Sequence, residues 1–267
     1  MWDSFQSRLW VTGTLQAETA IRIGCGSESV LPTAADLPVF REREEPIIPG
    51  SSLRGAVRSH LERIFRTLEP DYGHGRGACR VLDDESRCIS NKRYEQLQDE
   101  SKGDPEKLYR RVYEVSCRMC RLFGSPWLAS RIRFQDARPV NDVDVVRRDG
   151  VAINREKETV ENKYDFEVVN RGARFRLEIV AENLTTEELG VLFLALHELQ
   201  EGRVLVGGFK GRGLGSVRLA ETRVEMVDGT NRDELLGFLT TGRRREVPDS
   251  EIESALKALT EGLAKVG

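Results

Sequence analysis

Hydrophobic residues recur at every second position in several stretches, the spacing of half-buried β-strands. Residues 8–15, 131–136, 172–180 and 215–227 show this pattern. In residues 52–68 the apolar side chains stand instead at positions 53, 57, 61, 64, 65 and 68, the stripe of an amphipathic helix. A second helix is expected up to residue 199, because Thr185 and Glu188 form a capping box at its start. The order strand, helix, strand, strand, helix, strand predicts an α+β fold with a ferredoxin-like core.

The remaining stretches are expected as additions to this core. Residues 20–24 could continue the first strand after a bend, and Ser51 or Ser52 could cap the first helix. Residues 70–116 are polar and predict an insertion that contains a helix within residues 91–114. Residues 140–170 are charged and predict a protruding β-hairpin. We therefore expect a core over residues 1–227, which includes the insertion and the hairpin, and a helical C-terminal extension over residues 228–267, with helices at 231–239 and 249–265.

The total charge of the chain does not point to a nucleic-acid partner. Its 267 residues hold 41 basic and 44 acidic side chains, for a net charge of −3. The basic residues are unevenly distributed, however, with six arginines in residues 51–80 and six in residues 110–133. Such a polarised surface favours a polyanion partner, although a mixed solvated surface remains the alternative. The sequence has no apolar run of transmembrane length and no visible secretory signal, so we expect a cytoplasmic protein without a membrane partner.

Residues 207–215 contain five glycines, with Lys210 and Arg212 between them. Glycine lets backbone amides come close to a ligand, and the two cations suit phosphate, so the loop predicts binding of an anionic backbone. The spacing does not match a Walker loop, because Leu214 stands where the lysine is needed. It does not match a dinucleotide fingerprint either, because Ser216 stands at the third glycine position. The alternative is an ordinary flexible hairpin loop.

Four of the five cysteines stand in two pairs, Cys79 with Cys88 and Cys117 with Cys120. The second pair is a C-x-x-C motif, which commonly supplies half of a four-cysteine zinc site. Because the insertion offers few residues for a core, we expect a structural zinc to hold it together, with these four cysteines as ligands. Buried thiols without a metal, or a redox pair, are the alternatives. Cys25 stands apart from them.

Three stretches together resemble the RAMP superfamily of CRISPR effector proteins: residues 48–55, residues 121–125 and the glycine-rich loop. The chain is most similar to the repeated backbone subunit of type III complexes, in the zinc-bearing branch, and the resemblance covers residues 9–219. It implies an RRM-like core that binds guide RNA, stacks with copies of itself into a filament and contacts other effector subunits. The positions that match guide-contacting segments are Arg22, Ser51, Ser52, Arg54, Arg58, Lys210 and Arg212. Residues 140–170 match the thumb that wedges into the guide–target duplex.

The resemblance also implies endoribonuclease activity, because family members cut target RNA with a loop aspartate. Asp36 stands in the matching place. A fixed carboxylate there could hold Mg²⁺ or another divalent cation and promote attack by the RNA 2′-hydroxyl. Two alternatives remain open. Asp36 could be a silent turn residue in a purely structural RNA-binding subunit, or the chain could be a metabolic enzyme that binds a mononucleotide in its glycine loop.

Overall fold

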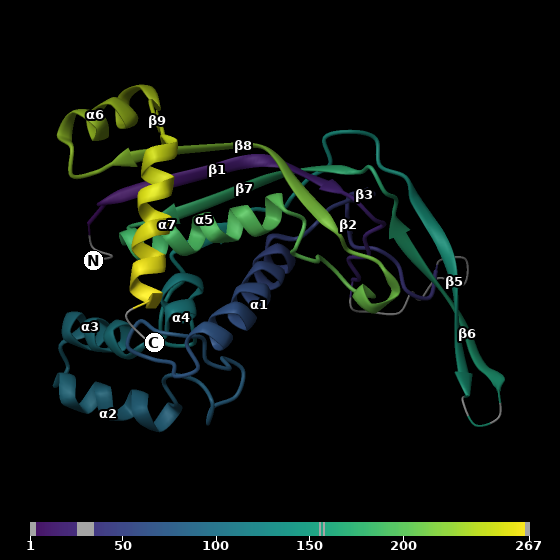
Figure 1. Cartoon of the computed structure of the whole chain (residues 1–267), viewed down its shortest axis with the longest axis horizontal. Coiled ribbons are helices and arrows are strands. Elements are labelled where there is room, and N and C mark those ends of the chain that lie inside the picture. The colour runs from purple at the N-terminus through teal and green to yellow at the C-terminus, as the bar shows by residue number, and fades with distance from the viewer. Residues whose placement is uncertain (1–3, 26–34, 155, 157, 265–267) are drawn as a thin grey trace.

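A five-stranded antiparallel sheet organises the molecule (Figure 1). The computed structural model describes residues 4–25, 35–154, 156 and 158–264. The strands lie side by side in the order β4 (Ile132–Phe134), β7 (Arg174–Glu182), β1 (Ser7–Ala17), β8 (Val217–Asp228) and β9 (Arg245–Glu246). The expectation of a mixed α+β protein is confirmed, and the four predicted strands correspond to β1, β4, β7 and β8.

Two helices cover one face of this sheet, α1 (Gly50–Leu68) and α5 (Thr186–Gln200) (Figure 1). The alternation of β1 points Leu9, Val11 and Leu15 into this interface, where each is at most 3% exposed. Burial of each such side chain stabilises the fold by about 1.5–3 kcal/mol. The expected capping box at Thr185 and Glu188 begins α5.

The C-terminal helices pack against the core from two sides. Helix α7 (Asp249–Ala264) crosses α5 so closely that a Cβ atom at Gly190 would lie 2.4 Å from the Ala255 carbonyl oxygen. Helix α6 (Arg232–Thr241) packs on the opposite face of the sheet, where the ring centroids of Phe238 and Trp10 are 5.3 Å apart. Both predicted helices of the extension are therefore present. No helix among the described residues is long and apolar enough to cross a membrane.

The insertion forms its own small helical layer, with α2 (Asn91–Ser101), α3 (Pro105–Val115) and the short α4 (Arg118–Phe123). The helix expected within residues 91–114 is present as α2, and a second helix, α3, follows it. The chain reverses after α2, because Lys102 adopts a left-handed conformation and Asp104 caps a new helix that Pro105 begins. The insertion also buries more apolar surface than expected, in a cluster around Ile89, Leu97, Val112 and Leu128.

The expected hairpin is present as β5 (Val145–Asn154) and β6 (Thr159–Val169), which project away from the sheet (Figure 1). At its base it meets two irregular segments. Residues 20–24 do not continue β1 as a strand; single bridges join Ile21 to Val169 and Gly24 to Val39. Residues 35–40 run between residues 20–24 and the hairpin, and lead into the short strands β2 (Arg41–Glu42) and β3 (Glu45–Pro46).

Candidate functional site

A second, smaller core lies where the hairpin, the glycine-rich loop and the Asp36 segment meet. We call it the junction core, and it is separate from the core under the main sheet. Its buried members are Ala20, Phe166, Val168 and Leu214, and its partly buried members are Leu37, Val146, Tyr164 and Phe209. Each of the three segments contributes an apolar side chain, so this packing fixes their polar residues relative to one another.

The glycines of the loop serve two different purposes. A Cβ atom at Gly207 would lie 2.3 Å from the Arg22 carbonyl oxygen, and one at Gly215 would lie 2.4 Å from the Val206 carbonyl oxygen. These two glycines therefore let the protein's own backbones approach each other. Gly211 and Gly213 face open space instead, and Gly213 has a positive φ of 78°. Only this second pair leaves room for a ligand near the backbone.

Phe209 enters the loop in a left-handed conformation, with a φ of 57°, which is uncommon for a bulky residue. A single turn of 3₁₀-helix, Lys210–Arg212, follows it. The guanidinium groups of Arg22 and Arg212 each lie 4.8 Å from the centroid of the Phe209 ring. Arg212 also donates a hydrogen bond to the hydroxyl of Tyr164 on β6. The fold thus brings together Arg22 and Arg212, which are far apart in the sequence.

Arg22 carries a positive charge for which the described residues supply no carboxylate partner. Its Nε is buried without a hydrogen-bond partner, and no described carboxylate forms an ion pair with it. Burial lowers the pKa of Arg22 below its ordinary value, because desolvation disfavours the charged form. An anion placed against the Arg22–Phe209–Arg212 group would offset this penalty, and guanidinium groups suit the planar, bidentate recognition of phosphate or carboxylate.

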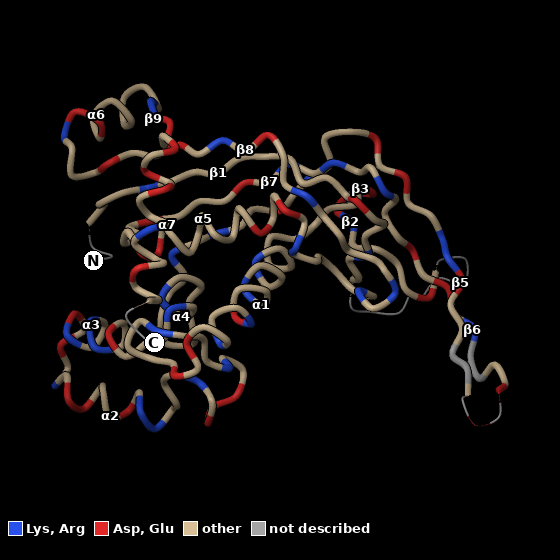
Figure 2. The backbone as a smooth tube through the Cα atoms, viewed as in Figure 1, with Lys and Arg blue, Asp and Glu red and all other residues tan. Residues whose placement is uncertain are grey.

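Lys210 lies beside helix α1. It is exposed, and it lines a cavity of about 150 Å³ between the loop and α1. The cavity also contains basic residues that the sequence did not single out: His60, Arg63 and Arg203. His60 and Arg63 lie on α1 and Arg203 lies just before the glycine-rich loop. Only the fold shows that these three residues come together. Figure 2 shows basic residues along α1 and at the turn that carries Lys210.

Helix α1 begins differently from the expectation. Its N-cap is Pro49, without a side-chain cap, so the expected role of Ser51 or Ser52 as cap is wrong. The carboxylate of Asp136, just after β4, accepts a hydrogen bond from the Gly50 amide at 2.7 Å. Gly50 packs closely against the end of β4, since a Cβ atom at Gly50 would lie 2.1 Å from the Phe134 carbonyl oxygen. Ser51 is left exposed and Ser52 half-buried.

The two arginines of α1 make internal contacts. Arg54 donates to the Phe123 carbonyl oxygen at the end of α4, and Arg58 donates to the Gly124 carbonyl oxygen at 2.9 Å. Arg58 also pairs with Glu62 at 2.8 Å, and its side chain is only 11% exposed. Both guanidinium groups therefore join α1 to α4, and the structure does not bring Arg58 to the junction.

Asp36 is exposed and docks on the base of the hairpin. Its Oδ2 accepts a hydrogen bond from the Asp165 amide at 2.9 Å, and Oδ1 of Asp165 accepts one from the Asp36 amide at 2.8 Å. The next residue, Leu37, packs in the junction core. Asp36 is thus bound to Asp165, and the neighbours of Asp165 on β6, Tyr164 and Phe166, both belong to the junction core. This attachment places a carboxylate at the edge of the junction.

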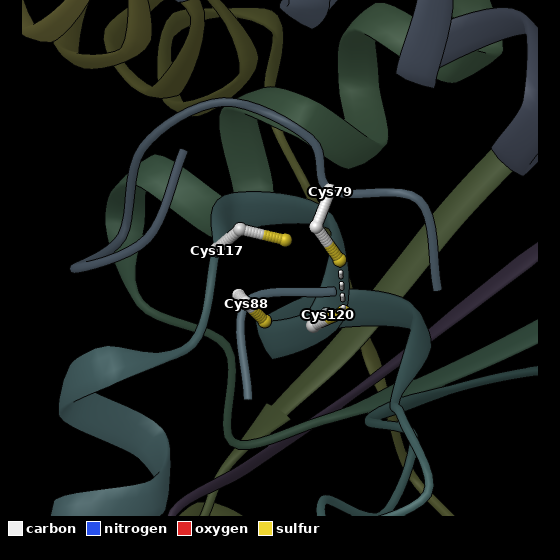
Figure 3. A group of neighbouring side chains, drawn as sticks. All are labelled: Cys79, Cys88, Cys117 and Cys120. Carbon is white, nitrogen blue, oxygen red and sulfur yellow. Dashed lines mark hydrogen bonds between the residues drawn. The ribbon is translucent and has the colours of Figure 1, made fainter. Parts of the chain in front are cut away.

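The four paired cysteines converge at α4 (Figure 3). The Sγ atoms of Cys79, Cys88, Cys117 and Cys120 all lie within 4.8 Å of one another. Tetrahedral ligands about 2.3 Å from a zinc ion would be separated by about 3.8 Å, so this group needs only a small contraction to hold one. Hydrogen bonds from the thiols of Cys120, Cys79 and Cys88 hold the pKa of Cys117 well below its usual range. The set fits a soft metal ion, for which thiolates are the preferred ligands.

Comparison with known proteins identifies a family and three named relatives. The family model of the RAMP superfamily matches residues 14–218. The chain is 28% identical over 146 residues to the CRISPR system Cms endoribonuclease Csm3 of Mycobacterium tuberculosis, covering 53% of this chain and 47% of the relative. It is 33% identical over 78 residues to the protein of that name from Enterococcus italicus, covering 28% and 36%.

A third relative is matched along most of its length. The chain is 24% identical over 272 residues to the CRISPR system Cms endoribonuclease Csm3 of Methanothermobacter thermautotrophicus, covering 87% of this chain and 94% of the relative. The chain thus spans about half of the first relative, about a third of the second and nearly all of the third. The family match covers strands β2 to β7, helices α1 to α5 and the junction, and on this evidence the chain belongs to the RAMP superfamily.

Proposed function

We propose that this chain is a guide-RNA-binding subunit of a type III CRISPR effector complex and that it cleaves the complementary target RNA. The observation that carries the proposal is the junction. There, an unneutralised Arg22, stacked with Arg212 on Phe209, and the anchored carboxylate of Asp36 are fixed to one small core. The names of the relatives, which are CRISPR endoribonucleases, support the same function.

Guide RNA would lie along α1 and the turn after Phe209. In this proposal Arg22, Lys210 and Arg212 neutralise backbone phosphates, and the hydroxyls of Ser51 and Ser52 donate to the same backbone. Arg54 and Arg58 support the surface by joining α1 to α4, and a direct contact of either with RNA remains a prediction. The hairpin β5–β6 would act as the thumb, and its exposed Val151 and Val160 suit contact with nucleobases.

Cleavage would use the 2′-hydroxyl of the target as the nucleophile. Its oxygen attacks the adjacent phosphorus, the bond from phosphorus to the 5′-oxygen breaks, and a 2′,3′-cyclic phosphate and a 5′-hydroxyl are left. Asp36 accepts the proton of the 2′-hydroxyl, and water protonates the departing oxygen. A divalent cation such as Mg²⁺, held at Asp36, would neutralise charge on the phosphate.

Two structural assignments belong to the proposal. The strand order β4-β7-β1-β8, with α1 after β1 and α5 after β7, supports a ferredoxin-like, RRM-like core within residues 1–227. The four-cysteine group supports a structural zinc that ties the insertion to α4. We also propose that copies of the chain stack into a filament along one guide RNA, together with other effector subunits.

RNA extracted from the purified complex tests the binding part of this proposal. The chain is expressed with its neighbouring genes and a CRISPR array, and the bound nucleic acid is sequenced. We expect guide RNA from the array, held with an affinity that falls steeply with salt. Saturable binding of a mononucleotide with little salt dependence, and no RNA, would contradict the proposal and favour a metabolic enzyme.

A further inference from the structure

Asp36 and Asp165 hold each other in a reciprocal clasp. Each carboxylate accepts a hydrogen bond from the other residue's backbone amide, at 2.9 Å into Asp36 and at 2.8 Å into Asp165. Oδ2 of Asp36 is engaged in this clasp, whereas its Oδ1 makes no hydrogen bond or ion pair among the described residues. The clasp therefore leaves one oxygen of the candidate catalytic carboxylate available and fixes the direction in which it points.

Two carboxylates this close would repel each other without a counter-charge. Arg147, on the neighbouring strand β5, supplies it by forming an ion pair with Oδ2 of Asp165. The two oxygens of Asp165 are thus both engaged, one with the Asp36 amide and one with Arg147. Its side chain is 15% exposed, so it has little room for another partner. Asp165 is well suited to orient a neighbour and poorly placed to react itself.

The clasp is part of a longer attachment of the loop to β6. Leu37 bridges to Phe166 in parallel register, through its amide to the Asp165 carbonyl at 3.2 Å and its carbonyl to the Glu167 amide at 3.0 Å. Two residues beyond Asp165 on the same side of the strand, Glu167 accepts from the Val39 amide at 3.0 Å and pairs with Arg41 at 2.8 Å. With the loop already held at these points, the Asp165 carboxylate acts mainly on the orientation of Asp36.

We propose that Asp165 is a positioning residue for target cleavage, because its carboxylate holds the Asp36 backbone so that Oδ1 of Asp36 faces the substrate. This inference rests on the proposed function of Asp36. Asp165 acts through Asp36 and contacts neither the RNA nor the reacting atoms. The hairpin would then have two roles, since the strand that carries the thumb also aligns the carboxylate at its base.

The test compares Asp165→Ala with Asp165→Asn in the assembled complex. Asparagine keeps a side-chain oxygen that can accept from the Asp36 amide, whereas alanine removes it. We expect Asp165→Ala to slow cleavage about 10–100-fold, the cost of misplacing a reacting group by about an ångström, with unchanged guide and target binding. The Mg²⁺ concentration for half-maximal cleavage should rise in Asp165→Ala, and Asp165→Asn should restore both values to within about threefold of wild type.

The matched control is Asp228→Ala. Asp228 also accepts a hydrogen bond from a backbone amide, that of Thr230 at 2.8 Å, but it is the last residue of β8 and pairs with Ser7 at the start of β1. The Asp228→Ala complex should cleave target RNA like the wild-type complex. Wild-type cleavage by Asp165→Ala, while Asp36→Asn is inactive, would overturn the inference and leave the proposed function standing. Loss of RNA binding along with cleavage in Asp165→Ala would reduce Asp165 to a structural role. A wild-type complex that does not cut would instead remove the proposed function itself.

Discussion

The roles of single arginines depend on whether their charges are neutralised inside the chain. Arg212 donates to Tyr164, Arg58 pairs with Glu62, and Arg22 stacks on Phe209 without a carboxylate partner. A desolvated, unpaired guanidinium lowers the stability of the free protein unless an anion binds to it. We therefore assign Arg22 to ligand binding. Arg58 instead stabilises the fold through its internal ion pair.

Replacing Arg22 with glutamine should weaken RNA binding regardless of sequence. The slope of log affinity against log salt should fall by about 0.7, the value for one lost phosphate contact on a single strand. Filter binding over a salt series measures this slope. Arg243→Gln serves as the control, because Arg243 is exposed and follows the C-cap of α6. An unchanged slope in the Arg22 variant would exclude a phosphate contact there.

Glu69 and Arg118 form a buried ion pair that fastens α1 to α4, at 3.0 Å with both side chains at most 6% exposed. Glu69→Ala would leave Arg118 with only the more exposed Glu187 as partner. We expect the free energy of unfolding to drop by about 3–5 kcal/mol. The exposed pair of Glu106 and Arg110 is the matched control, and Glu106→Ala should cost at most about 1 kcal/mol. Denaturant melts that show equal losses for the two variants would contradict this assignment.

At the scale of elements, the start of α1 illustrates where local sequence is insufficient. The stripe of apolar residues predicts the helix well, and residues 52–68 fall inside the observed Gly50–Leu68. The cap could not be predicted, because serine preferences are local and the Asp136 carboxylate arrives from a segment 86 residues away. The boundary between α2 and α3 is local instead, because Lys102 in a left-handed conformation ends α2 and Asp104 caps α3.

Asp136→Ala should destabilise the protein by about 1 kcal/mol, because it removes the acceptor of the Gly50 amide at a helix N-terminus. Thermal unfolding measures the loss. Asp142→Ala, at an exposed position without a described hydrogen bond, should leave the melting temperature unchanged. Equal melting temperatures for the two variants would show that Asp136 is not the cap in solution.

At the scale of the whole molecule, sequence patterns predicted the secondary-structure elements but did not predict how distant segments pack against one another. The strands, the two main helices, the hairpin and the convergence of two distant cysteine pairs were all accessible from spacing. The junction core was not, because Leu37, Phe166, Phe209 and Leu214 come from three segments with no shared periodicity. The role of Asp165 could not be predicted for the same reason, because it depends on a hydrogen bond with Asp36, which is 129 residues away in the sequence.

The four-cysteine group should make the stability of the molecule depend on a metal ion. The purified protein should carry about one zinc per chain, and a strong chelator should lower its melting temperature. Acid should increase the chelator's effect, because protons compete with the metal for thiolates and metal binding releases protons. Elemental analysis of Cys117→Ala should show zinc loss, with Cys25→Ala, outside the group, as the control. Full zinc content in Cys117→Ala would exclude these ligands.

The measurement that tests the central claim most directly is cleavage of a labelled RNA complementary to the bound guide, in the presence of Mg²⁺. Wild type, Asp36→Asn and the control Asp99→Asn, at an exposed position on α2, are compared in the assembled complex. We predict regularly spaced cuts with 2′,3′-cyclic phosphate ends in wild type and control, and none in Asp36→Asn, which should still bind guide and target. Undiminished cutting by Asp36→Asn would contradict the account, and intact binding without cutting in all three would leave a structural RNA-binding subunit.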